Sequence, residues 1–149
     1  MADFKLVKQL REETNVSYAI CQDALKQADG DIIKAREFLR EKGADVAAKK
    51  ASRALKEGRV FSYVHHNQQM GAMVVLMCET DFVAKNELFQ ELGNNIAMQI
   101  ASTNPENIEE LLASPFIKDP SSTIDQLIKD VILKMGENTA IGEFQRFEI

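Results

Sequence analysis

One ten-residue stretch decides how this chain is organised: Thr80-Asp81-Phe82-Val83-Ala84-Lys85-Asn86-Glu87-Leu88-Phe89. It follows an apolar, β-branched run at residues 73–78, which is typical of a buried strand. After it, apolar residues recur at three- and four-residue spacing, which predicts an amphipathic helix: Phe89, Leu92, Ile96 and Ile100. The stretch therefore lies where a strand is followed by a helix. At such a corner a rigid base can hold side chains outward.

Two residues of this corner have alternative interpretations. Thr80 is suited to cap the helix, and Asp81 would then lie in the first turn, where a carboxylate complements the helix dipole. In one interpretation Asp81 only supports this cap and Phe82 is a plug in the core, as aromatic residues near such corners commonly are. In the other, Phe82 points outward and is available to a partner.

Composition and charge limit the class of protein. A chain of 149 residues with 28% charged residues is typical of a soluble, folded protein of one domain, or of a small module plus a compact domain. Its apolar runs are too short to span a membrane and its start lacks the apolar core of a signal peptide, so we expect a cytoplasmic protein. Residues 1–59 carry 13 Lys and Arg against 10 Asp and Glu, whereas residues 60–149 carry 5 against 13. This acidic second part disfavours nucleic acid and favours a protein partner.

The first part of the chain predicts three short helices over residues 4–43. Ser17 and Asp31 are suited to cap the second and third helices. The apolar faces contain Leu6, Val7 and Leu10, then Cys21, Ala24, Leu25 and Ala28, then Ile32, Ala35, Phe38 and Leu39. Gly43 predicts the end of the third helix, as a left-handed cap. Residues 44–59 predict a helical, basic connector, with an RNA or phosphate patch as the alternative.

The remainder predicts a small sheet packed with helices. Residues 60–65 alternate, with Val60, Ser62 and Val64 on one face, and pair with residues 72–78 as a hairpin. Helices are expected from about residue 86 to 101, near 108–112, and from Thr123 to Gly136. A last strand over 141–149 has Ile141, Phe147 and Ile149 as apolar positions. The expected fold class is α+β: a three-helix module at 1–43, a linker at 44–59 and a core at 60–149 with an antiparallel three-stranded sheet.

The sequence contains few residues suited to chemistry. The two cysteines and two histidines, Cys21, Cys78, His65 and His66, raise the question of zinc, but no pair has chelate spacing, and adjacent histidines on a strand point to opposite faces. A Cys78–His65 nucleophile pair across the hairpin is an alternative to an inert core thiol. The chain has no glycine-rich phosphate loop and no nucleophile elbow. We therefore expect no metal, no cofactor and no enzymatic activity.

The ten-residue stretch also carries a family resemblance. Residues 80–87 with Phe89, preceded by Cys78-Glu79, resemble the signature of translation elongation factor Ts. Residues 4–43 resemble the ubiquitin-associated-type module that opens that family, through Leu10-Arg11-Glu12, Thr14, Cys21, Ala24-Leu25, Gly30-Asp31, Ala35, Leu39-Arg40 and Lys42-Gly43. Residues 115–121 and 147–149 resemble the carboxyl-terminal end of the family's core.

The resemblance implies guanine-nucleotide exchange on the GTPase elongation factor Tu. It implies a wedge that disturbs the magnesium and phosphate side of the nucleotide site, formed by Thr80, Asp81, Phe82 and Val83. It implies an N-terminal docking surface formed by Leu10, Arg11, Val16, Ser17, Tyr18, Ala19 and Ile20, and a contact from the core end at Phe147. Family members commonly carry glycine and paired methionines at residues 16–20, so this chain departs from the pattern there.

The chain is short for this family. Longer members place further material after the position of Pro105 and hold two core subdomains, whereas this chain has room for one. Short members pair two chains, so a homodimer is our hypothesis. Two alternatives remain: a ubiquitin-associated-type protein-binding module with an appendage, and a non-exchanging relative that only binds or stabilises elongation factor Tu. The stretch at residues 80–89 discriminates against the first, since a peptide binder has no need of it.

Overall fold

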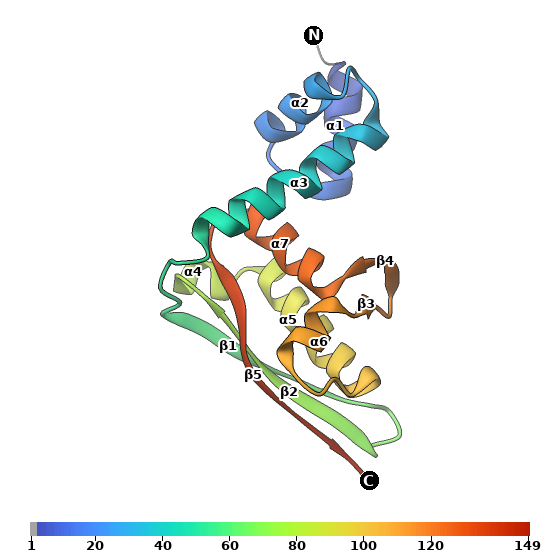
Figure 1. The fold of residues 1–149 in the computed structure, drawn as a ribbon, viewed down its shortest axis with the longest axis vertical. Helices are drawn as coiled ribbons and strands as arrows, with labels where there is room; N and C mark the ends of the chain where they lie inside the picture. The colour runs from blue at the N-terminus through green and yellow to red at the C-terminus, as the bar shows by residue number, and fades with distance from the viewer. Residues whose placement is uncertain (1–2) are drawn as a thin grey trace.

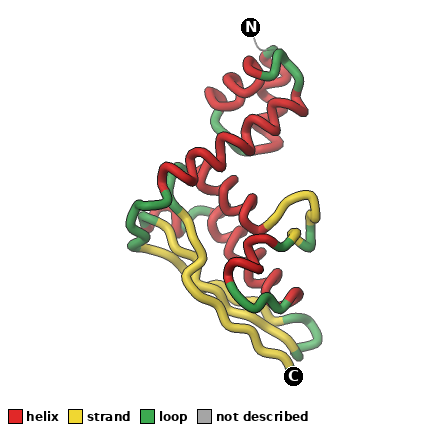
Figure 2. Tube along the Cα trace, viewed as in Figure 1, coloured by secondary structure: helices red, strands yellow, loops and turns green. Residues whose placement is uncertain are grey.

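The structure is a computed structural model that describes residues 3–149. Three helices lie at one end of the long axis and a sheet at the other, so the N- and C-termini are far apart (Figure 1). Figure 2 shows helices gathered on one side of the strands. The predicted α+β fold class is confirmed: three N-terminal helices precede an antiparallel three-stranded sheet packed with helices.

The N-terminal helices are α1 (Phe4–Thr14), α2 (Tyr18–Gln27) and α3 (Ile32–Lys50). The predicted caps are present: the Ser17 side chain accepts a hydrogen bond from the Ile20 N–H, and the Asp31 carboxylate accepts from the N–H groups of Ile33 and Lys34. The helices bury a small apolar core of their own, which includes Val7, Leu10, Cys21, Leu25, Ala35 and Leu39. The caps fix where the helices begin, and this core packs them together as one module.

The predicted end of the third helix at Gly43 is wrong. Helix α3 continues to Lys50, and Gly43 is buried within it. The reason is close packing, because a Cβ atom at Gly43 would lie 3.4 Å from the backbone oxygen of Lys129 in α7 (Ile124–Met135). Glycine is here a contact point between two helices and not a stop signal. One continuous helix therefore joins the module to the core, and Val46 packs against both apolar clusters.

The sheet has the strand order β1 (Glu57–Val64), β2 (Met70–Cys78) and β5 (Thr139–Glu148), with antiparallel neighbours. Its third strand does not alternate as predicted. The register shifts so that Ile141 pairs with Leu76 but Phe144 pairs with Val74, which places one extra residue in β5. Such a bulge reverses the faces beyond it. Phe144 therefore packs on the core, whereas Phe147 lies on the opposite face and is 70% exposed.

One face of the sheet is covered by α5 (Glu87–Thr103) and, beyond it, by α7. Phe61 of β1 and Phe89 of α5 place their ring centroids 5.9 Å apart, in the middle of this core. Two smaller elements follow α5: α6 (Ile108–Ala113) and a hairpin of β3 (Pro115–Phe116) and β4 (Asp119–Thr123). The buried Gln99 side chain holds this hairpin, since its amide donates to the Pro115 oxygen and accepts from the Ile117 N–H.

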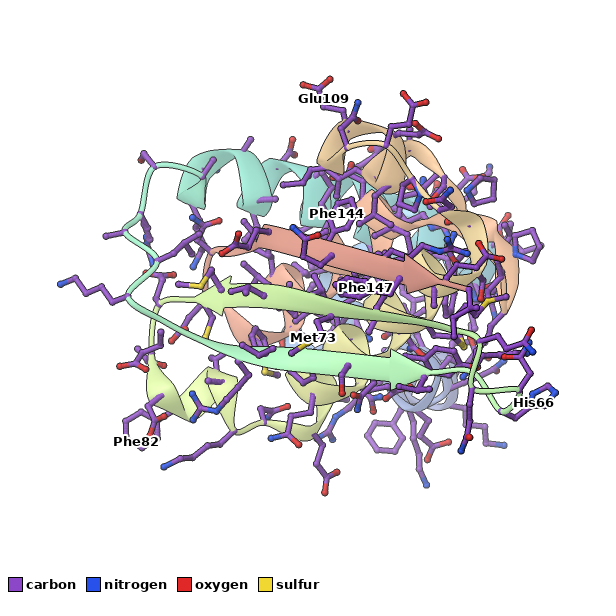
Figure 3. All side chains as sticks on the ribbon, turned by 90° about the horizontal axis from the view of Figure 1, so that it is seen from below. His66, Met73, Phe82, Glu109, Phe144 and Phe147 are labelled. Carbon is purple, nitrogen blue, oxygen red and sulfur yellow. The ribbon has the colours of Figure 1, made fainter. Side chains whose placement is uncertain are left out.

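The other face of the sheet is open to solvent in the part of the chain that the structure describes. Figure 3 looks onto this face and shows Met73 and Phe147 on it. We call this the outer sheet face, defined by its exposed apolar residues Val60, Val64, Met73 and Phe147. Among residues 3–149, no helix is long and apolar enough to cross a membrane.

Candidate functional site

The corner after β2 is a single turn of helix, α4 (Asp81–Ala84), with one buried side. Thr80 is an N-cap as predicted, because its hydroxyl accepts a hydrogen bond from the Val83 N–H at 3.4 Å, but it caps this separate turn. The long helix α5 begins at its own cap, Asn86, whose side chain accepts from the Leu88 N–H. Val83 and Ala84 are buried in the main core. A helix this short is not stable alone, so its direction is set by these tertiary contacts.

Phe82 is 89% exposed, and its ring projects away from the ribbon at the edge of the molecule (Figure 3). The interpretation of Phe82 as a core plug is therefore wrong. Successive helical residues point about 100° apart, so burial of Val83 and Ala84 turns Phe82 outward. Phe89 fills the core instead and is fully buried. A large aromatic side chain is thus exposed on a backbone that the core holds in place.

Asp81 is held by two cations. Its carboxylate oxygens lie 2.7 Å from Nζ of Lys85 and 2.7 Å from Nη2 of Arg59. These hydrogen bonds, first from Lys85 and then from Arg59, lower the pKa of Asp81 below its ordinary value. Because Arg59 belongs to β1 and Lys85 follows α4, Asp81 ties the exposed turn to the edge of the sheet as well as carrying a negative charge beside Phe82.

Two carboxylates tie the corner to the loop between α7 and β5. Glu137 accepts hydrogen bonds from both the N–H and the hydroxyl of Thr80, at 3.0 Å and 2.7 Å. In the opposite direction, Glu79 accepts from the N–H of Asn138 at 2.7 Å. Sequence reasoning missed Glu137, since it lies 57 residues from Thr80 and nothing in the local pattern points to it.

The predicted N-terminal docking residues differ in exposure. Leu10 and Val16 are buried in the module core, so their side chains form the scaffold and not the surface. Ile20 is half-buried, and the exposed members of the group are Arg11, Ser17, Tyr18 and Ala19. Phe4 was not predicted: it is exposed, and its ring centroid lies 6.1 Å from that of Tyr18. The module therefore presents a pair of exposed aromatic rings at the start of α2.

The structure does not bring the three predicted contact regions together. Phe147 pairs with Gly71 at one end of β2, whereas the corner follows Cys78 at the other end. Seven residues of strand separate these positions by about 23 Å. The N-terminal module lies at the far end of the long axis (Figure 1). A partner that touches all three must therefore be large.

The histidines and cysteines do not form a site. The pairing places Cys78 opposite Glu57, whereas His65 follows Val64 at the other end of the hairpin, so the Cys78–His65 pair is excluded. Burial raises the pKa of the Cys78 thiol, which donates to the Thr80 oxygen at 3.2 Å. The expectation that the histidines point apart is wrong, because β1 ends before them and their ring centroids lie 4.1 Å apart. Over residues 3–149 no group of three or more His, Cys, Asp and Glu residues is arranged to hold a metal ion.

Comparison with known proteins gives one family. The family model described as elongation factor TS matches residues 79–149, which begin at the corner. An elongation factor Ts from Oleidesulfovibrio alaskensis is 41% identical over 189 aligned residues, covering 97% of this chain and 96% of the relative. One from Clostridium novyi is 44% identical over 149 residues, and one from Clostridium botulinum is 42% identical over the same length.

The chain matches translation elongation factors along its length, and it belongs to the elongation factor Ts family. This confirms the resemblance drawn from residues 80–89. The chain spans about half the length of its Clostridium relatives, of which it covers 49% and 48%.

Proposed function

We propose that this protein promotes guanine-nucleotide exchange on the GTPase elongation factor Tu. The observation that carries the proposal is the exposed Phe82 ring, presented beside Asp81 on a turn whose other side is buried. Aromatic anchors that fill a partner's pocket commonly dominate binding energy, and a ring held outward on a turn that the core anchors is placed to act as one. Membership of the elongation factor Ts family supports the choice of partner.

The proposed mechanism is linkage and needs no covalent chemistry. A protein that binds the nucleotide-free GTPase more tightly than the nucleotide-bound form weakens nucleotide binding by the same factor. Phe82 enters an apolar slot of the GTPase, and Asp81 perturbs the structure beside it. The magnesium ion that screens the charge of the nucleotide phosphates is then displaced, which favours release of GDP. The protein acts without a cofactor of its own, in the cytoplasm, where translation takes place.

The separated surfaces supply the free energy that one ring cannot. The exposed docking residues around Tyr18 hold the GTPase domain in register, and Phe147 contacts another domain of the same partner. The distance between the corner and Phe147 along β2 suits a partner of several domains. The net charge of −5 also fits a protein partner better than RNA.

The test is release of fluorescent GDP from elongation factor Tu at a substoichiometric dose of this protein. We expect multiple turnovers of release. Binding without release would support elongation factor Tu as the partner but overturn the exchange activity, and would indicate a relative that only binds or stabilises the GTPase. Absence of binding would overturn both, and would leave a ubiquitin-associated-type binding module as the better description.

We further propose that two copies of the chain pair through the part of the outer sheet face that Val60, Val64 and Met73 form, which leaves Phe147 for the GTPase. These three residues are exposed and apolar and lie on a sheet with two edges, and such surfaces usually mark association. Light scattering at micromolar concentration should give twice the mass of one chain. Met73→Glu should yield monomers, whereas Gln90→Glu adds the same charge on α5 and should not. A mass of one chain that is independent of dilution would overturn the proposal.

A further inference from the structure

The loop between α7 and β5 is bonded to two parts of the chain at once. We call residues Gly136, Glu137 and Asn138 the junction loop. On one side, Glu137 accepts both hydrogen bonds that Thr80 donates, from its N–H at 3.0 Å and from its hydroxyl at 2.7 Å. On the other side, the Asn138 side chain donates to the Arg53 oxygen at 3.0 Å, just after α3. The junction loop therefore joins the corner to the end of the long connecting helix.

The junction loop is itself well anchored. Gly136 ends α7 in the left-handed conformation, with φ +75°, and its backbone oxygen accepts a hydrogen bond from the Lys50 side chain. The Asn138 side chain is buried, and its backbone N–H donates to Glu79 at 2.7 Å. Lys50 of α3, the end of α7 and Glu79 just after β2 therefore hold the junction loop through contacts that do not involve α4.

Glu137 controls the cap of α4 through the direction of one hydroxyl. Because the Thr80 hydroxyl donates its proton to Glu137, its lone pairs are turned toward the Val83 N–H, from which it accepts at 3.4 Å. The Thr80 cap and the burial of Val83 fix the first residues of α4. Phe82 lies between Thr80 and Val83 in the sequence, so its direction is fixed with them. A hydrogen bond to a carboxylate is stronger and more directional than one between neutral groups.

We propose that Glu137 is a positioning residue for the Phe82 wedge. It holds the Thr80 cap so that α4 presents Phe82 at one fixed angle before the GTPase arrives, and it does not itself touch the partner. The inference rests on the proposed function. The physical basis is pre-organisation. If Thr80 does not hold the cap, part of the free energy of Phe82 binding is used to order the turn, and that part no longer favours nucleotide release.

The central variant is Glu137→Gln, which keeps the size of the side chain but offers one acceptor where Thr80 presents two donors, so that only one of the two hydrogen bonds can keep its present direction. We expect the maximal rate of stimulated GDP release to fall about fivefold or more, the factor that corresponds to one lost hydrogen bond. The concentration for half-maximal release should change much less, because the N-terminal docking surface is untouched. Glu109→Gln is the matched control, since Glu109 is exposed on α6 and lies on the opposite side of the view from Phe82 (Figure 3).

A double-mutant cycle separates positioning from general damage. If Glu137 acts through Phe82, Glu137→Gln combined with Phe82→Ala should release GDP no more slowly than Phe82→Ala alone. Amide hydrogen exchange, followed by mass spectrometry without any GTPase present, should be faster across residues 80–85 in Glu137→Gln and unchanged in α6. If Glu137→Gln does not fold, Thr80→Val removes only the hydroxyl bonds and should give the same split between rate and half-maximal concentration.

Failure of this inference is distinguishable from failure of the proposed function. If Phe82→Ala slows release but Glu137→Gln does not, the wedge stands and the positioning role is overturned. The positioning role is also overturned if the effects of Glu137→Gln and Phe82→Ala on the rate of GDP release are additive. If Phe82→Ala releases GDP as fast as the unchanged protein, the wedge itself fails and the role of Glu137 falls with it.

Discussion

The guanidinium of Arg59 and the carboxylate of Asp81 join the first strand to the exposed turn, with Nη2 of Arg59 2.7 Å from Oδ1 of Asp81. Neither side chain is deeply buried, so solvent screens the pair and its contribution to folding is small. Its effect is geometric, because it fixes the carboxylate beside Phe82. The two roles of an ion pair, stability and orientation, are therefore separable at this position.

Arg59→Met tests that separation. We expect the melting temperature to change little and the stimulated release of GDP to slow severalfold, since Asp81 keeps Lys85 but loses its link to β1. Lys8→Met removes an exposed pair with Glu12 on α1 and should change neither quantity. Thermal melts and GDP release on the same preparations are the measurement. A large fall in melting temperature in Arg59→Met would show that the pair is mainly structural.

Phe82→Ala and Phe89→Ala should affect different properties, exchange and stability, although both remove a phenylalanine side chain and the two positions are only seven residues apart. Phe82 is exposed, so its loss should leave stability unchanged and reduce exchange by the equivalent of about 1–3 kcal/mol. Phe89 is fully buried, so its loss should cost about 3–5 kcal/mol of unfolding free energy. Urea unfolding and GDP release distinguish the two. Unfolding of Phe82→Ala would contradict the structure.

Gly93→Ala tests the packing of α5 on β1. A Cβ atom at Gly93 would overlap the ring of Phe61, which is itself packed against Phe89. We expect a loss of about 1–3 kcal/mol of unfolding free energy, as for other overpacked cores. Adding Phe61→Leu to Gly93→Ala should restore part of this loss, so that the two changes are not additive. Strict additivity in urea unfolding would show that the ring is not the obstacle.

We expect the unfolding free energy to depend on pH because of Asp130. Burial raises the pKa of this α7 carboxyl above its ordinary value, against the opposing charges of Lys134 and Arg40. The folded state therefore holds the Asp130 proton more tightly than the unfolded state, and its contribution to stability falls as pH rises from the ordinary pKa through the raised one. Asp130→Asn mimics the protonated form. It should raise the unfolding free energy at about pH 7, and the gain should shrink toward zero at about pH 3.5.

The control for this pH effect is Asp125→Asn on the same helix, whose carboxylate pairs with Lys129 at 2.6 Å. Its removal should not stabilise the protein at neutral pH. Urea unfolding of both variants at the two pH values is the measurement. If Asp130→Asn is no more stable than the unchanged protein at neutral pH, Lys134 and Arg40 compensate the burial in full.

Where a helix begins could be predicted from the sequence because a cap is a local interaction. Ser17, Asp31, Thr80 and Thr123 each accept from backbone N–H groups within three residues, and the geometry of such a cap depends little on the rest of the chain. The end of α7 at Gly136 is equally local, since its φ is +75°. Gly43 resembles a similar signal but serves contact with α7, which local reasoning does not include.

The sequence by itself determined the kinds and order of the main helices and strands, the three-stranded sheet and the family, because these depend on periodicity, on caps and on one ten-residue motif. It did not give the separate turn α4 or the pairing of β3 with β4. Only the tertiary structure decided that Phe82 points outward, that the bulge in β5 puts Phe147 on the outer sheet face, and that Glu137 holds Thr80. Each of these depends on atoms brought together from distant parts of the chain. Burial of Val83 against the core turns Phe82 outward, and no pattern within the motif contains that core.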